Sequence, residues 1–324
     1  MSIVRYTRKT AVLARLESAY GAEPEENWTS SDVVLVRNAT FRIARDTEPR
    51  ELLRPYLGGS EHMVAARRSE LEFEVEFAAS GVAGTPPAWG RLLRACGMSE
   101  TIVAGSRVEY LPVSGGFESL TLRFNVDGMR YASRGARGSA KFLCNAYKIP
   151  VIQFKFWGFD TWAAEGNSFS TTGYNYAAWQ RPEVISDSNS GDIRLGGGLV
   201  GGAPSGGTLL PSQGLEVDLS NKLSHIKMLG GEAVDIVERD VMGKMTVALS
   251  PADEVAWRSE INANALTSVG FNFGTATGRR VHLHAPSVQR VDPQMRDYEG
   301  RALMETELRC LPVEGNDELR VIVR

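Results

Sequence analysis

One segment alternates carboxylates with apolar residues so strictly that its secondary structure is almost fixed. Residues 69–78 read SELEFEVEFA. Because successive side chains of a β-strand point to opposite faces, the segment places acids on one face and apolar groups on the other. The acids are Glu70, Glu72, Glu74 and Glu76, and the apolar residues are Leu71, Phe73, Val75 and Phe77. The pattern predicts an antiparallel strand with one face on a core. The acidic face is either an ordinary solvated surface or a negative wall with a use, since like charges in a row repel one another.

Length and composition narrow the class of protein. A chain of 324 residues is long enough for two domains, each with its own core. The net charge of −3 argues against a dedicated nucleic-acid binder, which is normally basic. The cysteines, Cys96, Cys144 and Cys310, lack metal-ligand spacing and predict thiols in a reducing compartment. Neither a membrane-spanning run nor a secretory signal is visible, so we expect folding in a cytosol and no membrane partner.

The order of predicted elements indicates a mainly β protein in four parts. We expect an N-terminal arm over 1–32, a first domain over 33–160, a Gly/Ser-rich connection over 161–213 and a second domain over 214–324. Residues 9–20 have the spacing of a short amphipathic helix, and 88–96 that of a helix ended by Gly97. Alternation predicts strands over 33–44, 107–113, 119–127, 129–135 and 147–158. In the connection we expect short strands near 181–186 and 192–195 and a mobile glycine loop over 191–207.

The second domain repeats the element order of the first. Residues 214–229 alternate like 33–44, and 235–249 parallel 62–77. A helical segment then puts Trp257 in the place of Trp89. That helix covers 251–262, and strands at 268–275, 279–285 and 302–311 close the series. We interpret this order as an internal duplication of a β-sandwich or barrel domain with a flanking short helix.

No motif indicates catalysis, a cofactor or a metal. His282 and His284 share one face of a predicted strand, but no third ligand has suitable spacing. The run GGGLVGGAPSGG at 196–207 lacks the lysine and the strand-to-helix context of a phosphate-binding loop. The glutamates of the stripe follow one strand instead of facing each other as glycosidase carboxylates do. The sequence therefore predicts a protein that is not an enzyme and that holds no cofactor or metal.

Several segments, most of them in the first half of the chain, share one family resemblance. They are KTAVLARLESAYGAEP at 9–24, VVLVRNATFRI at 33–43, LLRPYLGGS at 52–60, LEFEVEFAASGVAGTPPAWGRLLRACGMSET at 71–101, PVSGGFESLTLRFNVDG at 112–128 and RGARGS at 134–139. These segments resemble tail tube proteins, the major tail proteins of long-tailed, siphophage-type bacteriophages. The resemblance covers most of residues 1–160 and is most specific at PPAWGRLLRACG, whereas the second half matches by pattern. It implies a β-sandwich tube domain whose strands join those of neighbouring subunits in a closed barrel around a lumen.

The resemblance gives the acidic stripe a function. Tube lumens in this family are characteristically acidic, so that phage DNA passes non-specifically. We therefore expect Glu70, Glu72, Glu74 and Glu76 to face the lumen, the alternative being the tube exterior. The aligned strand of the second domain offers Lys244, Thr246 and Ala248, which would charge the lumen in alternate sectors.

The resemblance also implies partners. Rings of this family are usually six-fold, so a chain with two tube domains would form a homotrimeric, pseudo-six-fold ring. The N-terminal arm and the charged connection 45–61 are the expected contacts between rings, unless the connection is only a mobile surface hairpin. The inter-ring candidates are Arg45, Asp46, Glu48, Arg50, Glu51 and Arg54. Tape-measure, tail terminator and distal tail proteins are the other expected partners, with assembly in the bacterial cytoplasm and a final location in the virion.

Two rival functions stay open at this point. The first is a baseplate or fibre-type module that recognises a protein or a sugar through aromatic residues of 160–180. Those residues are Trp162, Tyr174, Tyr176 and Trp179. The second is an enzyme with an unrecognised site at His282 and His284.

Overall fold

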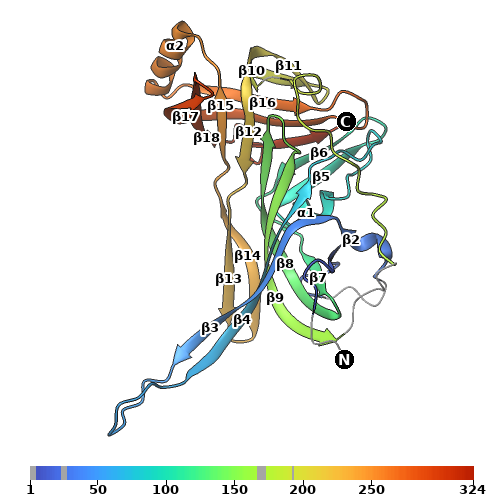
Figure 1. The fold of residues 1–324 in the computed structure, drawn as a ribbon, viewed down its shortest axis with the longest axis vertical. Helices are drawn as coiled ribbons and strands as arrows, with labels where there is room; N and C mark the ends of the chain where they lie inside the picture. Colours follow the sequence, from blue (N-terminus) through green and yellow to red (C-terminus); the bar gives the residue numbers. More distant parts are fainter. Residues whose placement is uncertain (1–4, 23–27, 166–172, 192) are drawn as a thin grey trace.

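The computed structural model describes residues 5–22, 28–165, 173–191 and 193–324. Within them the protein is mainly β, as the alternating segments predict, with two α-helices, α1 (Gly90–Arg94) and α2 (Pro251–Asn262). Seventeen strands belong to one antiparallel sheet, and β13 (Asn221–Met228) and β14 (Gly231–Arg239) form a separate hairpin. Figure 1 shows an elongated molecule in which two hairpins extend from the body in the same direction.

Eight strands of the large sheet lie side by side in a continuous band, which we call the wall. From one edge to the other they are β3 (Val36–Pro49), β4 (His62–Glu76), β9 (Val151–Glu165), β8 (Met129–Asn145), β12 (Ser212–Asp218), β15 (Met242–Val247), β18 (Arg301–Cys310) and β17 (Val281–Tyr298). Each neighbouring pair is antiparallel. The wall therefore contains strands from both halves of the chain, which meet where β8 pairs with β12.

The remaining strands branch from the wall and enclose the core with it. β7 (Leu120–Val126), β1 (Thr10–Leu16) and β2 (Val33–Val34) continue from β8. β16 (Leu266–Phe273) and β19 (Arg320–Val323) pair with β17, β6 (Arg107–Pro112) and β5 (Met98–Val103) follow β19, and β10 (Ile193–Val200) and β11 (Ala203–Leu210) follow β16. A three-residue 3₁₀ helix, Ser30–Asp32, precedes β2.

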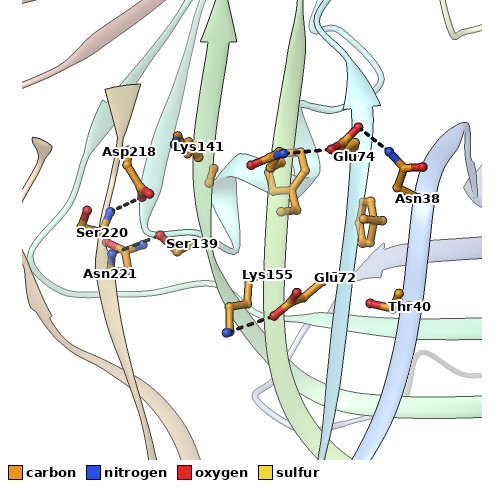
Figure 2. Close-up of a pocket in the computed structure, with 14 residues that line it drawn as sticks. Asn38, Thr40, Glu72, Glu74, Ser139, Lys141, Lys155, Asp218, Ser220 and Asn221 are labelled. Atoms are coloured by element: carbon orange, nitrogen blue, oxygen red, sulfur yellow. Dashed lines mark hydrogen bonds and ion pairs between the residues drawn. The ribbon is translucent and has the colours of Figure 1, made fainter. Parts of the chain in front are cut away.

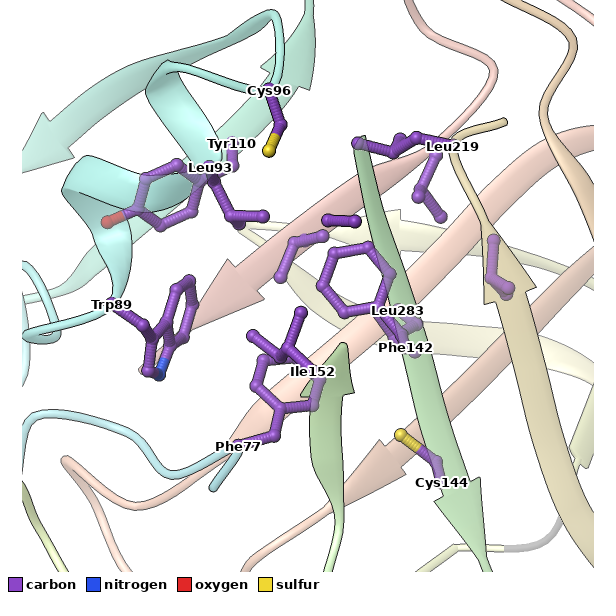
Figure 3. Packing of buried hydrophobic residues seen from close by; sticks show 14 of the residues in the cluster. Phe77, Trp89, Leu93, Cys96, Tyr110, Phe142, Cys144, Ile152, Leu219 and Leu283 are labelled. Atoms are coloured by element: carbon purple, nitrogen blue, oxygen red, sulfur yellow. The ribbon is translucent and has the colours of Figure 1, made fainter. Parts of the chain in front are cut away.

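Side chains from both halves of the chain share this core, among them Phe77 and Phe142 from the first half and Leu219 and Leu283 from the second (Figure 3). The ring of Phe77 lies 5.3 Å from Trp89, 5.3 Å from Phe142 and 5.4 Å from Phe273, measured between centroids. Trp89 also contacts Tyr110 and donates a hydrogen bond of 2.7 Å to the carbonyl of Ala78. The buried face of the acidic-stripe strand thus holds α1 against the body, since Trp89 directly precedes that helix.

Two expectations about local structure are wrong. The helix expected over 9–20 is strand β1, because Val12, Leu13 and Ala14 are fully buried and a strand covered on both faces loses its alternation. The expectation for 181–207 is wrong in part: the strand expected near 192–195 is the beginning of β10, but 181–186 forms no strand and the glycine loop is instead part of the hairpin β10–β11. Gly201 and Gly202 close that hairpin with φ of 58° and 77°, values that a two-residue turn of this kind requires.

The long alternating segments of the second half are each divided into two strands. Residues 214–229 contribute β12 to the wall and β13 to the separate hairpin, and 235–249 contribute β14 and β15 in the same way. The chain leaves the wall at Ser220, which has a φ of 49°. As a result β13–β14 extends beside the hairpin β3–β4 (Figure 1), and Lys227 forms an ion pair with Asp46 between them.

Candidate functional site

The predicted acidic stripe lies on β4, and its two faces are separated as the alternation requires. Leu71, Phe73, Val75 and Phe77 are all buried in the core. On the opposite face Glu72 is exposed, Glu74 and Glu76 are half-buried, and Glu70 is buried.

Neighbouring strands partly neutralise the stripe, which sequence reasoning did not foresee. Lys155 on β9 lies directly opposite Glu72, with its Nζ 3.0 Å from the carboxylate (Figure 2). Glu74 accepts hydrogen bonds from the amide of Gln153 at 2.8 Å and from Asn38 at 3.0 Å. These partner residues lie on strands that are distant from β4 in the sequence, so no local sequence pattern predicts the contacts.

Glu70 has the strongest set of partners. Its carboxylate accepts hydrogen bonds from the guanidinium groups of Arg42 on β3 and Arg68 on β4. Because paired residues of an antiparallel sheet share a face, Arg42 lies on the same face of the wall as the stripe. A buried carboxylate needs such partners, and Glu70 is only 7% exposed.

The same polar face continues across the wall from β4 to β18. Following the pairing from Glu74 leads through Gln153 and Lys141 to Asp218 on β12. Following it from Glu216 on β12 leads through Lys244 to Glu307 on β18. Carboxylates of β4, β12 and β18 therefore face the same way as lysines of β9, β8 and β15. We call this surface the polar wall face.

Each lysine of the polar wall face lies against a carboxylate. Lys141 is 3.2 Å from Glu216, and Lys244 is 2.9 Å from Glu305, in addition to the contact of Lys155 with Glu72. A comparison of β4 with β15 alone predicts Lys244 and Thr246 as lumen-facing residues of the second half. It misses the acidic residues on β12 and β18. A shallow hollow over β4, β9, β8 and the start of β13 is lined almost entirely by these polar side chains (Figure 2).

The inter-ring candidates lie on the hairpin β3–β4 and its tip. Arg45, Glu48, Arg50, Glu51 and Arg54 are exposed, and Arg50 forms an ion pair with Glu61. Asp46 lies 3.6 Å from Arg68 and also contacts Lys227, whose hydrogen bond and charge lower the pKa of Asp46.

Apolar residues dominate the very end of this hairpin, which the charge pattern did not indicate. Leu53 and Leu57 are fully exposed, and Leu52, Tyr56, Met63 and Val64 are largely exposed. The shorter hairpin β13–β14 also ends on exposed apolar residues, Met228 and Leu229. We call residues 50–61 the arm tip.

The two histidines form no metal site among the residues that the structure describes. His282 and His284 are buried on β17, and no third ligand lies with them. Burial lowers the pKa of His282 to about 4, and the nearby charges of Arg324 and Arg280 act in the same direction. The pKa of His284 is also lowered, chiefly by burial.

The aromatic residues of 160–180 do not form an exposed platform in the part of the chain that is described. The Nε1 of Trp179 donates to the carbonyl of Val33 at 3.0 Å, and the ring packs on the core. The hydroxyl of Tyr174 accepts from Asn125 at 2.9 Å, whereas Tyr176 is partly exposed. The side chain of Trp162 lies outside the described residues.

The fold and this face define a structural β protein with a long polar wall and an extended hairpin. Comparison with known families identifies the chain more closely: the model of the phage tail tube protein family matches residues 7–302. The chain belongs to this family and is a structural virion component that self-assembles into the phage tail tube. No curated protein gives a significant match. Among the described residues, no helix is long and apolar enough to cross a membrane.

Proposed function

We propose that three copies of this chain close a ring and that rings stack into a hollow tube through which DNA leaves the virion. The observation that carries the proposal is the wall: eight antiparallel strands with one face on the core and the other largely polar. In the described residues, β3 and the part of β17 from 290 to 298 each have one unpaired edge. A band of this width is suited to closure by copies of itself, and closure removes these exposed edges.

In this proposal the polar wall face lines the lumen. DNA binds proteins mainly through phosphates and cationic side chains that release counterions. The lysines of the wall, Lys141, Lys155 and Lys244, are each held by a carboxylate of a neighbouring strand. The face therefore offers acids and neutralised bases, which lets a polyanion pass with little adhesion. The glutamates of the stripe keep the role expected from the sequence, now as part of a larger surface.

The hairpin β3–β4 is the proposed contact between stacked rings, with the charged residues Arg45–Arg54 and the apolar arm tip as its contact groups. Tape-measure protein inside the tube and terminator and distal tail proteins at its ends are the proposed further partners. In this role the protein has no catalytic task, and assembly takes place in the bacterial cytoplasm.

Charge reversal of the stripe tests the lumen assignment. Phage carrying Glu72→Lys and Glu74→Lys should form tails of normal length but deliver DNA poorly, because unpaired lysines would then face the phosphates. A matched control reverses two exposed acids outside the wall, Asp187→Lys and Glu314→Lys, and should infect normally. The measurements are electron microscopy of tails and the infectivity of the particles. Normal infectivity with the stripe reversed would remove it from the lumen.

A further inference from the structure

The wall consists of two groups of four strands with the same connectivity. The spatial order is β3, β4, β9, β8 in the first group and β12, β15, β18, β17 in the second. When the four strands of a group are numbered in chain order, their spatial order is first, second, fourth, third in both groups. An α-helix follows the second strand in both groups.

A bulge in the first strand of each group marks corresponding positions. The pairing of β3 with β4 shifts between Arg37 and Thr40, where Asn38 has a φ of 50°. The pairing of β12 with β15 shifts between Ser212 and Gly214, where Gly214 has a φ of 117°. Bulges are specific local features, so their shared place allows the groups to be matched residue by residue.

Inside the chain, the two groups meet at β8 and β12. Asn145 lies opposite Gly214, and Lys141 lies opposite Asp218. The contact continues beyond the strands, since the amide of Leu219 donates to the carbonyl of Ala140 at 3.0 Å. The third strand of one group is thus joined to the first strand of the next.

The two outer strands of the wall lack such a contact in the described residues. β3 pairs only with β4, and the part of β17 from 290 to 298 pairs only with β18. These edges belong to the same strand types that meet inside the chain, the first and the third of a group. Because eight strands alternate in direction, β17 of one copy and β3 of another would also run antiparallel.

We propose that β3 of a second copy pairs with the free edge of β17 and adopts the register that β8 and β12 show inside the chain. The proposal rests on the proposed function and adds to it the identity of the two edges and their alignment. The last residues of β8 and β17, Asn145 and Tyr298, correspond, as do Gly214 and Asn38. Tyr298 then faces Asn38 of the second copy, Arg296 faces Thr40, and Gln294 faces Arg42.

Pro293 fits this register. It corresponds to Ala140, whose carbonyl accepts the hydrogen bond from Leu219 at the internal junction. Proline has no N–H and is tolerated in sheets mainly at edges and bulges. It keeps its carbonyl, which in the proposed register accepts from the amide of Ile43 of the second copy. The register also keeps the polar wall face of both copies on one side, which a shift by one residue would reverse.

Disulfide cross-linking in assembled tubes tests the register. The pair Thr40→Cys and Arg296→Cys should link different chains on mild oxidation, since Thr40 and Arg296 lie on the opposite edge strands of one wall. Directly opposed residues have Cβ atoms about 4.5–5.5 Å apart and diagonal ones about 7–8 Å, and disulfides need Cβ atoms about 3.5–4.5 Å apart. The displaced pairs, Thr40→Cys with Gln294→Cys or with Tyr298→Cys, are matched controls. The native cysteines are buried.

We expect covalent multimers on a non-reducing gel at least five-fold more abundant for the Thr40–Arg296 pair than for either control. A mixture of the two single variants should give covalent dimers only. A higher yield from a displaced pair, or no link in intact tubes, would overturn the register and leave the tube function standing. Failure of the unsubstituted protein to form rings or tubes would instead count against the proposed function.

Amide hydrogen exchange gives a second readout that needs no substitution. On assembly of the unsubstituted protein, amides in 294–298 and in 38–43 should slow by ten-fold or more, because each edge gains partners. Unchanged exchange at these two edges in assembled tubes would overturn the proposal even if the cysteine variants failed to fold.

Discussion

At the scale of single residues, the wall shows how positively charged side chains can be present on a surface without binding phosphate. Arg68 illustrates this: its guanidinium contacts Glu70 at 2.8 Å and also stacks on the ring of Trp157 at 4.5 Å. A positive group so engaged has few donors left for phosphate. The same holds for Arg137, which contacts Asp235 at 2.7 Å and lies over Tyr20. The pairing of individual side chains, as much as the net charge, thus determines how strongly this surface attracts phosphate.

His282 gives a prediction about pH. Neither of its ring nitrogens has a hydrogen-bond partner among the described residues, and the charged groups around it, Arg280 and Arg324, are both positive. Folding therefore favours the neutral imidazole, and the pKa falls from 6.5 to about 4. Since the unfolded chain binds a proton below about 6.5, stability is full above that pH and declines toward pH 4 by about 1.4 kcal/mol per pH unit for this group.

The measurement is the free energy of urea unfolding of the unassembled protein at pH 7.5 and at pH 4.5. The variant His282→Leu should lose less stability between these values than the unsubstituted chain, and adding His284→Leu should reduce the loss further. His62→Gln, at an exposed position, is the control and should keep the full dependence. Equal pH dependence in all variants would show that the buried imidazoles do not govern acid stability.

At the scale of elements, the sequence predicts a feature well when its pattern is local. The alternation over β4 and the capped helix α2 are confirmed, the latter with the Ser250 side chain accepting from the amide of Asp253. β1 was mistaken for a helix because burial on both faces removes alternation. The partner of Glu72 was missed because Lys155 is far away in the sequence, and strand pairing is set by the whole fold.

The arm tip carries the prediction at this scale. Replacing residues 50–61 by Asn-Gly should leave the fold intact, since Pro49 and His62 are already paired and an Asn-Gly turn suits a two-residue hairpin loop. Leu53 and Leu57 make no core contact that the change would remove. We expect rings that do not stack, seen by electron microscopy and size-exclusion chromatography.

A milder change distinguishes the effect of the apolar side chains on stacking from the effect of shortening the arm. Leu53→Ser with Leu57→Ser keeps the length of the arm and should shorten tubes or raise the concentration at which they form. The matching variant of the shorter hairpin, Met228→Ser with Leu229→Ser, shows whether its exposed tip also contributes to stacking. Tubes of normal length and yield from the Asn-Gly variant would exclude the arm tip from the stacking contact.

At the scale of the molecule, the two four-strand groups of the wall carry hairpins of unequal length. Both hairpins, β3–β4 and β13–β14, extend in the same direction from the wall (Figure 1), and β3–β4 reaches farther. Each hairpin belongs to the first two strands of its group, because β13 continues β12 and β14 leads into β15. A ring of three chains would therefore present long and short arms in alternation, whereas six chains would double their number.

Ring symmetry distinguishes these arrangements. We expect end-on class averages of the purified protein to show a hollow ring with three-fold symmetry and six similar lobes, because each chain supplies two groups of four wall strands. We also expect a single ring to have the mass of three chains of 35.4 kDa each. This mass can be measured on the Asn-Gly arm variant, whose rings we expect to stay unstacked. True six-fold averages would keep the tube function but reject two tube domains per chain. Compact particles without a channel would reject the ring itself and return attention to a binding role.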